Sequence, residues 1–291
     1  MSLVETLNDL DRRWVFLAVG LAIVISTIFG LTFPEKATPM VRAIFDKVES
    51  LPAGSRVLLP FDYDPASEPE LQPMAEAFVR HCAEKGHKMY FIALWPLGQN
   101  MVDGVINRVL KEEYPDLRYG YDYMDLGFKS GNEGVIAVIL TDLKKLYTTD
   151  ARGTSIDSIP MLSDVTNIRS FDLILNVSAG YPGLKEWIQY AGTPGNIPVA
   201  GGCTAVQAPL LYPYYPDQLL GLMGGIKAAA EYEALLKSRY DFRGRRYQTA
   251  LIRMGPQTVT HLVIILFIIM GNVTFQIIRK RQGAVRLGAG R

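Results

Sequence analysis

Asp62 and Asp64 of this 291-residue chain are separated by one residue, a spacing that could support chemistry. Asp62 and Asp64 follow an apolar run, and two carboxylates on one turn are the ligands that a hard divalent cation favours. Pro65 comes next, and an Asp-Pro step is an ordinary turn in which Asp62 caps the following helix. We therefore favour the turn and predict no metal site.

Cys203 is the second candidate, because a thiol at the start of a helix has its pKa lowered by the helix macrodipole. A cysteine nucleophile also needs a base. The histidines of the chain are His81, His87 and His261. The first two belong to the opposite edge of the sheet predicted below, and the third lies in an apolar segment. We therefore predict no catalytic residue and interpret Cys203 as a small buried thiol.

Two stretches containing glycine could cradle a phosphate, because glycine lets backbone N–H groups approach an anion at a helix N-terminus. They are Gly-Gly-Cys-Thr at 201–204 and Lys-Ser-Gly-Asn-Glu-Gly at 129–134. Neither matches G-x-G-x-x-G after a strand or the P-loop pattern. In the second stretch Asn132 can serve as an N-cap with Glu133 in the first turn. We predict no cofactor.

Alternating strands and helices must position these residues. Short apolar runs of the buried-strand type lie at 56–61, 88–95, 171–177 and 197–200, and a polar-aromatic strand is predicted at 118–124. Helical spacing or helix boundaries mark 38–51, 70–85, 100–114, 132–147, the region around 183–190, and 217–240. This alternation predicts a doubly wound α/β domain with a mainly parallel five-stranded sheet.

Ligands of an open α/β sheet lie beyond the carboxyl ends of its strands. The candidate ligand pocket therefore consists of residues that follow three of the predicted strands: Asp62, Asp64, Ser178, Gly201, Gly202, Cys203 and Thr204.

The last predicted helix has small residues at every fourth position, namely Gly221, Gly225 and Ala229. A glycine costs a helix about 1 kcal/mol, so this face is expected to let another backbone come close. The partner is either the sheet of the same domain or a neighbouring subunit. Tyr212, Tyr214 and Tyr215 precede this helix and form either a packed turn or an exposed patch.

Two uncharged segments bracket the domain. Residues 14–33 and the run at 254–278 each contain at least twenty residues, which is long enough to cross a bilayer. We predict transmembrane helices at 14–33 and 257–278. The first continues beyond the length of a signal peptide and has no Ala-x-Ala cleavage site, so we interpret it as an uncleaved anchor.

Basic residues set the expected orientation. The tails at 1–13 and 279–291 contain seven of them: Arg12, Arg13, Arg279, Lys280, Arg281, Arg286 and Arg291. Short basic tails stay in the cytoplasm, so the domain is expected on the extracytoplasmic side, although the basic residues that flank the domain leave the cytoplasmic face as the alternative.

The domain and its connection to the second span differ in charge. Residues 34–242 contain 19 basic and 26 acidic residues, whereas the neck at 243–256 is basic. The neck arginines are Arg243, Arg245, Arg246 and Arg253. We expect them to contact lipid headgroups; a solvated linker is the alternative.

Composition excludes several other classes of protein. The net charge is +1, with 20% charged and 49% hydrophobic residues, which excludes a disordered or nucleic-acid-coating protein. Two cysteines without Cys-x-x-Cys spacing exclude a disulfide framework and a structural zinc site.

Four phrases of the chain are similar to an uncharacterised family of prokaryotic membrane-anchored α/β proteins without a known activity. They lie at 59–65, 187–190, 204–209 and 224–233. The resemblance implies the architecture only. We expect a membrane-tethered, non-enzymatic component that assembles with copies of itself or binds other membrane proteins. The alternative is a ligand-binding or hydrolytic domain that uses the pocket at the strand ends.

Overall fold

The structure is a computed structural model that describes residues 10–240, 242 and 244–288, and of these the side chains of Arg245 and 281–288 are left undescribed. The chain divides into two units. One is the α/β domain, Pro34–Leu251, and the other combines the segments before and after it, up to Phe33 and from Ile252. Each unit is described by itself.

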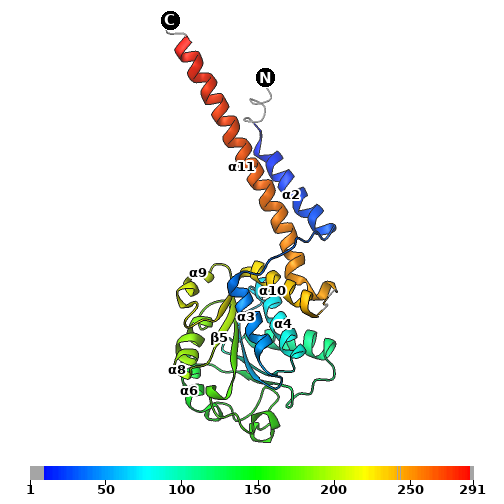
Figure 1. Cartoon of the computed structure of the whole chain (residues 1–291), viewed down its shortest axis with the longest axis vertical. Coiled ribbons are helices and arrows are strands. Elements are labelled where there is room, and N and C mark those ends of the chain that lie inside the picture. Colours follow the sequence, from blue (N-terminus) through cyan, green and yellow to red (C-terminus); the bar gives the residue numbers. More distant parts are fainter. Residues whose placement is uncertain (1–9, 241, 243, 289–291) are drawn as a thin grey trace. The chain divides into compact units, whose positions relative to one another are not determined.

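The domain contains one sheet with helices beside it (Figure 1). The sheet has six parallel strands in the order β3-β2-β1-β4-β5-β6. The strands are β1 (Arg56–Asp62), β2 (Lys88–Ala93), β3 (Tyr123–Phe128), β4 (Leu173–Ser178), β5 (Val199–Cys203) and β6 (Gly221–Gly224). Apolar runs form these strands because helices cover both faces of the sheet, as β4 shows with every residue buried. The predicted α/β class and parallel sheet are confirmed, with an arrangement of the Rossmann type, but the sheet has six strands rather than the predicted five.

The helices of the domain are α3 (Pro39–Ser50), α4 (Glu68–Glu84), α5 (Gly98–Val105), α6 (Glu133–Thr141), α7 (Leu184–Trp187), α8 (Thr193–Gly195), α9 (Ala208–Leu211) and α10 (Gly225–Tyr240). Helix α3 precedes β1, α10 follows β6, and the other helices of the domain lie between successive strands. Two of them continue as π-helical turns, α5 through Ile106–Lys111 and α7 through Ile188–Gly192. Helix α10 packs on α3 and α4.

The prediction of one helix over 217–240 is wrong, because 221–224 form the sixth strand and α10 begins only at Gly225. Gly221 and Ala229 therefore do not share a helix face. Gly221 nevertheless allows a close approach, since a Cβ there would lie 2.3 Å from the backbone oxygen of Met40 in α3. Gly225 has φ 75°, a left-handed conformation that ends the strand and starts the helix. Close packing at these glycines occurs within the domain.

Two other strands differ from their predicted positions. Residues 118–124 were expected as a strand, but β3 begins at Tyr123, because 118–122 form turns around Gly120. Strand β5 extends through Gly201 and Gly202, which were expected in a loop.

The unit outside the domain contains two helices. Helix α2 spans Arg12–Ile28 and ends at a turn in which Gly30 has φ 58°. It is therefore shorter than the predicted span at 14–33. Helix α11 spans Thr249–Gly288, although its first three residues belong to the domain. Among the described residues, one helix, within Thr249–Lys280, is long and apolar enough to cross a membrane, so the prediction of one such helix at each end is shown only for the C-terminal one.

Candidate functional site

The strand order reverses between β1 and β4, and this is where open α/β sheets bind ligands. Asp62 ends β1 and lies opposite Ser178, which ends β4. The predicted pocket residues at these two positions are therefore neighbours in the sheet.

The Asp62 carboxylate is completely buried and has three donors from the protein. Its Oδ1 accepts a hydrogen bond from the backbone N–H of Leu94 at 2.7 Å, and its Oδ2 accepts from Asn176 Nδ2 at 3.0 Å and Trp187 Nε1 at 2.9 Å. Burial raises the pKa of Asp62 to about 7, against the lowering effect of these donors. The carboxylate thus links four elements of the fold and is not open to a ligand.

Asp64 faces a different set of partners. Its Oδ1 accepts hydrogen bonds from the backbone N–H of Ser67 at 3.1 Å and from the Ser67 hydroxyl at 3.0 Å. Asp62 therefore does not cap α4, contrary to our prediction, because the strand directs it into the core. Asp64 closes the turn before the helix, whose N-cap residue is Ser67. Within the described part of the chain, no group of three or more His, Cys, Asp or Glu residues could hold a metal ion.

The start of α7 is also occupied by side chains of the domain. Ser178 Oγ accepts from the backbone N–H of Leu184 at 2.9 Å, and Glu186 Oε2 accepts from the N–H of Gly183 at 2.9 Å. An anion bound at the switch point of a Rossmann-type sheet uses such N–H groups. Here two side-chain oxygens already accept from them.

The stretch at 201–204 was considered as a phosphate cradle, but its residues 201–203 belong to β5 rather than to a loop. A Cβ at Gly201 would lie 2.4 Å from the backbone oxygen of Asn176, and one at Gly202 would lie 2.5 Å from Met74 Sδ. The two glycines therefore allow close packing within the sheet and against α4. Beyond the strand, the N–H of Ala205 donates to Glu70 Oε1 at 2.9 Å. A carboxylate of the domain therefore already binds an N–H group that a phosphate would need.

Cys203 and Thr204 end this stretch. The Cys203 side chain is completely buried, and desolvation raises the pKa of its thiol to about 12, opposite to the effect expected of a helix start. The Thr204 hydroxyl is buried and has no hydrogen-bond partner. His81 interacts with Tyr232 and Glu49, and His87 with the carbonyl of Val48, so neither forms a dyad with Cys203.

The second stretch considered as a cradle, at 129–134, leads into α6. Asn132 is the N-cap residue with φ 50°, and Glu133 occupies the first turn, where it accepts a hydrogen bond from the Tyr181 hydroxyl. Lys129 Nζ lies 5.1 Å from the centroid of the Tyr147 ring.

Trp95, in the loop after β2, contacts the loop after β4. Its Nε1 donates to the carbonyl of Pro182 at 2.8 Å. A Cβ at Gly180 would lie 3.2 Å from the Trp95 ring and 3.5 Å from Gln207 Nε2. The loops that follow β2, β4 and β5 therefore meet at Gly180.

Apolar side chains close to this meeting point are exposed. Leu97 is 49% exposed, Tyr181 58%, Val206 85% and Leu210 69%. The first three lie within two residues of Trp95, Gly180 and Gln207, and Leu210 follows Val206 by one helical turn. We refer to these four side chains as the carboxyl-edge rim.

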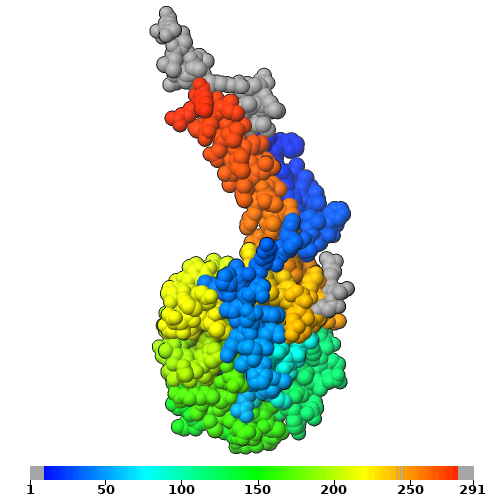
Figure 2. All heavy atoms as spheres, in the orientation of Figure 1, coloured from blue at the N-terminus to red at the C-terminus, as the bar shows by residue number. Residues whose placement is uncertain are grey.

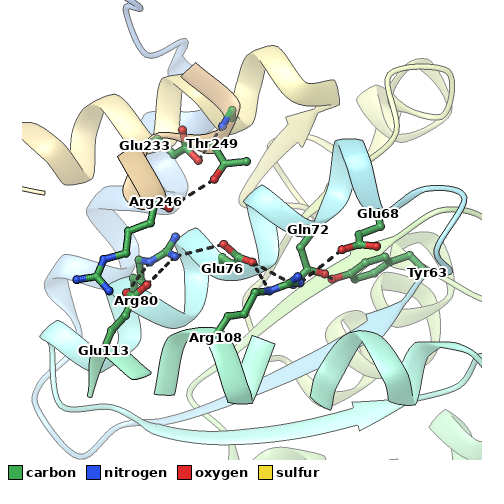
Figure 3. A network of polar contacts seen from close by, with 11 residues as sticks. Tyr63, Glu68, Gln72, Glu76, Arg80, Arg108, Glu113, Glu233, Arg246 and Thr249 are labelled. Carbon is green, nitrogen blue, oxygen red and sulfur yellow. Dashed lines mark hydrogen bonds and ion pairs between the residues drawn. The ribbon is translucent and has the colours of Figure 1, made fainter. Parts of the chain in front are cut away.

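A polar network on α4 was also missed (Figure 3). Arg80 Nε donates to Glu113 Oε2 at 2.9 Å and its Nη2 contacts Glu76 at 3.2 Å, while Arg108 Nε contacts Glu76 at 3.1 Å. The network continues through Gln72 to the Tyr63 hydroxyl. A sequence signal existed, because Glu68, Gln72, Glu76 and Arg80 recur at every fourth position, the spacing of one helix face.

The domain also holds the start of α11. Glu233 is 1% exposed and accepts hydrogen bonds from the N–H groups of Ala250 and Leu251, each at 3.0 Å (Figure 3 shows its position). Burial raises the pKa of Glu233 to about 7, although both donors lower it. Arg80 lies over the Tyr247 ring at 5.3 Å.

The predicted headgroup contacts lie partly outside the described residues, namely Arg243 and the side chain of Arg245. Arg246 is exposed and lies over the Tyr247 ring at 5.0 Å, and Arg253 is exposed in α11.

Two cavities of the domain lie away from the switch point. One of about 330 Å³ is lined by Gly192, Thr193, Asn196–Val199, Pro216–Gln218 and Leu220. One of about 280 Å³ lies where β1 and β2 begin, beside Arg56 and Lys88. Neither has a wall from the predicted pocket residues.

Comparison of the chain with protein-family models gives no match, and comparison with curated proteins gives none either.

Proposed function

We propose that this protein is a membrane-anchored, non-enzymatic assembly component whose α/β domains associate with each other through the carboxyl-edge rim. The observation that carries the proposal is the exposure of the four apolar rim side chains at the edge where Rossmann-type sheets bind ligands. This edge serves contacts between domains, because the side chains and N–H groups that could bind a ligand there form hydrogen bonds within the domain.

The groups that usually bind a ligand at this edge are hydrogen-bonded within the domain. This supports a contact role over the alternative of ligand binding or hydrolysis. Asp62 and Ser178 are buried and hydrogen-bonded within the domain. Glu70 accepts from the loop after β5, where a phosphate would need free N–H groups. A ligand would have to displace these contacts, each of which contributes about 0.5–1.5 kcal/mol.

Membrane attachment favours a second copy of the chain as the partner. Domains held at one membrane are confined to a thin layer, which raises their effective concentration and lets a small interface suffice. Burial of one leucine-sized side chain contributes about 1.5–3 kcal/mol. Four rim side chains from each of two copies are therefore sufficient for association at a membrane.

We also propose how the chain is anchored in the membrane. Helix α11 would be one span, and α2 with the residues that follow it would be the other, giving two passes and an extracytoplasmic domain. The basic tails and the exposed Arg246 and Arg253 support this arrangement, because arginines next to a span interact with anionic headgroups. Membership of the membrane-anchored α/β family described above belongs to the same proposal.

Native mass measurement of the full chain in lipid nanodiscs tests the function. We expect the wild-type protein to form an oligomer, and Leu210→Ser to weaken it by about tenfold or more, since about 1.5–3 kcal/mol is lost per copy. Tyr121→Ser is the matched control, because Tyr121 is 48% exposed but precedes β3, at the opposite edge of the sheet. A monomeric wild-type protein, or a Leu210→Ser oligomer as stable as wild type, contradicts the proposal.

A further inference from the structure

A cavity of about 450 Å³ lies beside the edge strand β6. Its walls come from the start of α3, the turn at Tyr212–Tyr214, β6 and α10: Thr38, Pro39, Met40, Tyr212, Tyr215, Leu222, Gly224, Lys227, Ala228 and Glu231. In Figure 2 the blue residues that include α3 border the yellow residues of the β6 region. The volume is within the range of small-ligand sites, about 300–1,000 Å³, and most of the wall is apolar.

The charged groups at the cavity leave a net negative charge. Lys227 Nζ is hydrogen-bonded to Glu231 Oε1 and lies 3.6 Å from Glu35 Oε2. Glu231 Oε2 accepts from both the N–H and the hydroxyl of Thr38, each at 2.8 Å. One cation thus faces two carboxylates. An anionic group would meet net negative charge here, so the cavity fits an apolar ligand rather than a phosphate.

Elements of the cavity wall are connected to both apolar segments of the chain. Glu35 and Thr38, which contact the cavity residues, come two and five residues after Phe33, where the predicted first span ends. Helix α10 provides Lys227, Ala228 and Glu231 to the cavity wall, and its Glu233 binds the first turn of α11, the helix that is apolar and long enough to span a membrane. The most concentrated apolar ligand at such a position is a membrane lipid.

We infer that this cavity binds one acyl chain of a bilayer phospholipid. The apolar wall around Met40, Leu222 and Ala228 would contact the chain, and burial of each methylene group from water favours binding. Tyr212 is 50% exposed, and tyrosine is enriched where apolar and aqueous surroundings meet at a membrane. The inference goes beyond self-association and does not depend on the rim.

Photo-cross-linking of the full chain tests it. The protein is reconstituted in phosphatidylcholine vesicles that include a phosphatidylcholine with a diazirine in one acyl chain, and labelled peptides are mapped after illumination. We expect label on peptides that contain Met40, Tyr212 or Leu222, in addition to label on the apolar helices. Label confined to the helices overturns the inference.

Two variants block the cavity differently. Ala228→Leu fills it, and overpacking of about 1–3 kcal/mol corresponds to roughly a tenfold loss of cavity label. Ala234→Leu, on the same helix but outside the cavity wall, is the control and should keep the label. Tyr212→Asp places a charge at a half-exposed position, which leaves the core intact while the charge disfavours an acyl chain.

Melting temperatures identify any variant that fails to fold. If Ala228→Leu fails to fold, the label on Tyr212→Asp decides whether the inference holds. Cavity label that stays at the wild-type level in folded Tyr212→Asp overturns the inference. Leu210→Ser should keep the cavity label even where it abolishes the oligomer, so failure of the lipid site and failure of the self-association proposal give different results.

Discussion

The indole Nε1 of Trp187 donates a hydrogen bond to Oδ2 of Asp62 over 2.9 Å, in a part of the domain where both side chains are completely buried. The contact joins the end of β1 to α7, 125 residues later in the chain. It shows why the switch point of this sheet is a structural centre: the carboxylate that ends β1 is surrounded by donors that belong to the protein.

Asp62→Asn should destabilise the domain without affecting its self-association. An amide offers one acceptor oxygen where Leu94, Asn176 and Trp187 all donate, so at least one buried donor loses its partner. The expected loss is about 1–3 kcal/mol in the free energy of unfolding. Chemical denaturation measures the loss, and native mass should remain that of the wild-type assembly. An unchanged denaturation midpoint would contradict the role of Asp62 as a buried acceptor.

Stability should fall as pH rises from 6.5 to 8. Asp62 and Glu233 have pKa values raised from 3.8 and 4.5 to about 7, so above their unfolded values the folded state binds more protons than the unfolded state. The stability that these two groups contribute is therefore greatest when the pH is below their pKa values in the unfolded state. It is lost as the pH rises through their pKa values in the folded state. His81, lowered from 6.5 to about 4, acts in the opposite sense, mainly below pH 6.5.

The net decrease over that interval is about 1 kcal/mol. Thermal unfolding at several pH values measures it. Asp62→Asn and Glu233→Gln should each flatten the slope, because each removes one titrating group. A melting temperature that rises between pH 6.5 and 8 would show that these carboxyl groups do not control the dependence.

Gly201→Ala should destabilise the domain by about 1–3 kcal/mol, because the new Cβ would meet the backbone oxygen of Asn176, which can move only with β4. Gly134→Ala is the control. It has no atom within 4 Å of its Cβ position and lies in α6, so the substitution should be neutral or stabilising by up to about 1 kcal/mol. Similar melting temperatures for the two variants would contradict the packing role of Gly201.

Apolar runs were sufficient to predict most of the sheet. Residues such as those of β1 and β4 are buried on both faces, and only a parallel sheet covered by helices requires such runs. Strand β6 was missed because its sequence, Gly-Leu-Met-Gly, has no β-branched or aromatic residue and follows helix-like spacing with α10. Its position is determined by α3, which packs on it from the other end of the domain sequence.

The sequence predicted the positions of the candidate site residues better than their roles. The sequence identifies Asp62, Ser178 and Cys203 as strand-end residues, which is correct. It does not show that Asn176, Trp187 and Glu70 bind the groups that a ligand would need, because these contacts join residues more than 100 positions apart. The exposure of Val206 and Leu210 likewise depends on which loops meet, and a single sequence gives no signal for that.

Topology can be tested by labelling, because both native cysteines are buried. Asn107→Cys places one exposed thiol on the domain. We expect a membrane-impermeant maleimide to label this thiol in whole cells, since the basic tails favour an extracytoplasmic domain. The wild-type chain should remain unlabelled under the same conditions. Labelling of the Asn107→Cys protein only after lysis would place the domain in the cytoplasm.

Cross-linking at the rim tests self-association most directly. Val206 is 85% exposed, and Val206→Cys gives a chain with one accessible thiol at the rim. Treatment of native membranes with a homobifunctional maleimide should produce a covalent dimer of Val206→Cys, and much less of Asn107→Cys, whose thiol lies away from the strand ends. Absence of the Val206→Cys dimer, or equal dimer yields from both positions, would contradict the conclusion that the carboxyl-edge rim joins copies of this chain.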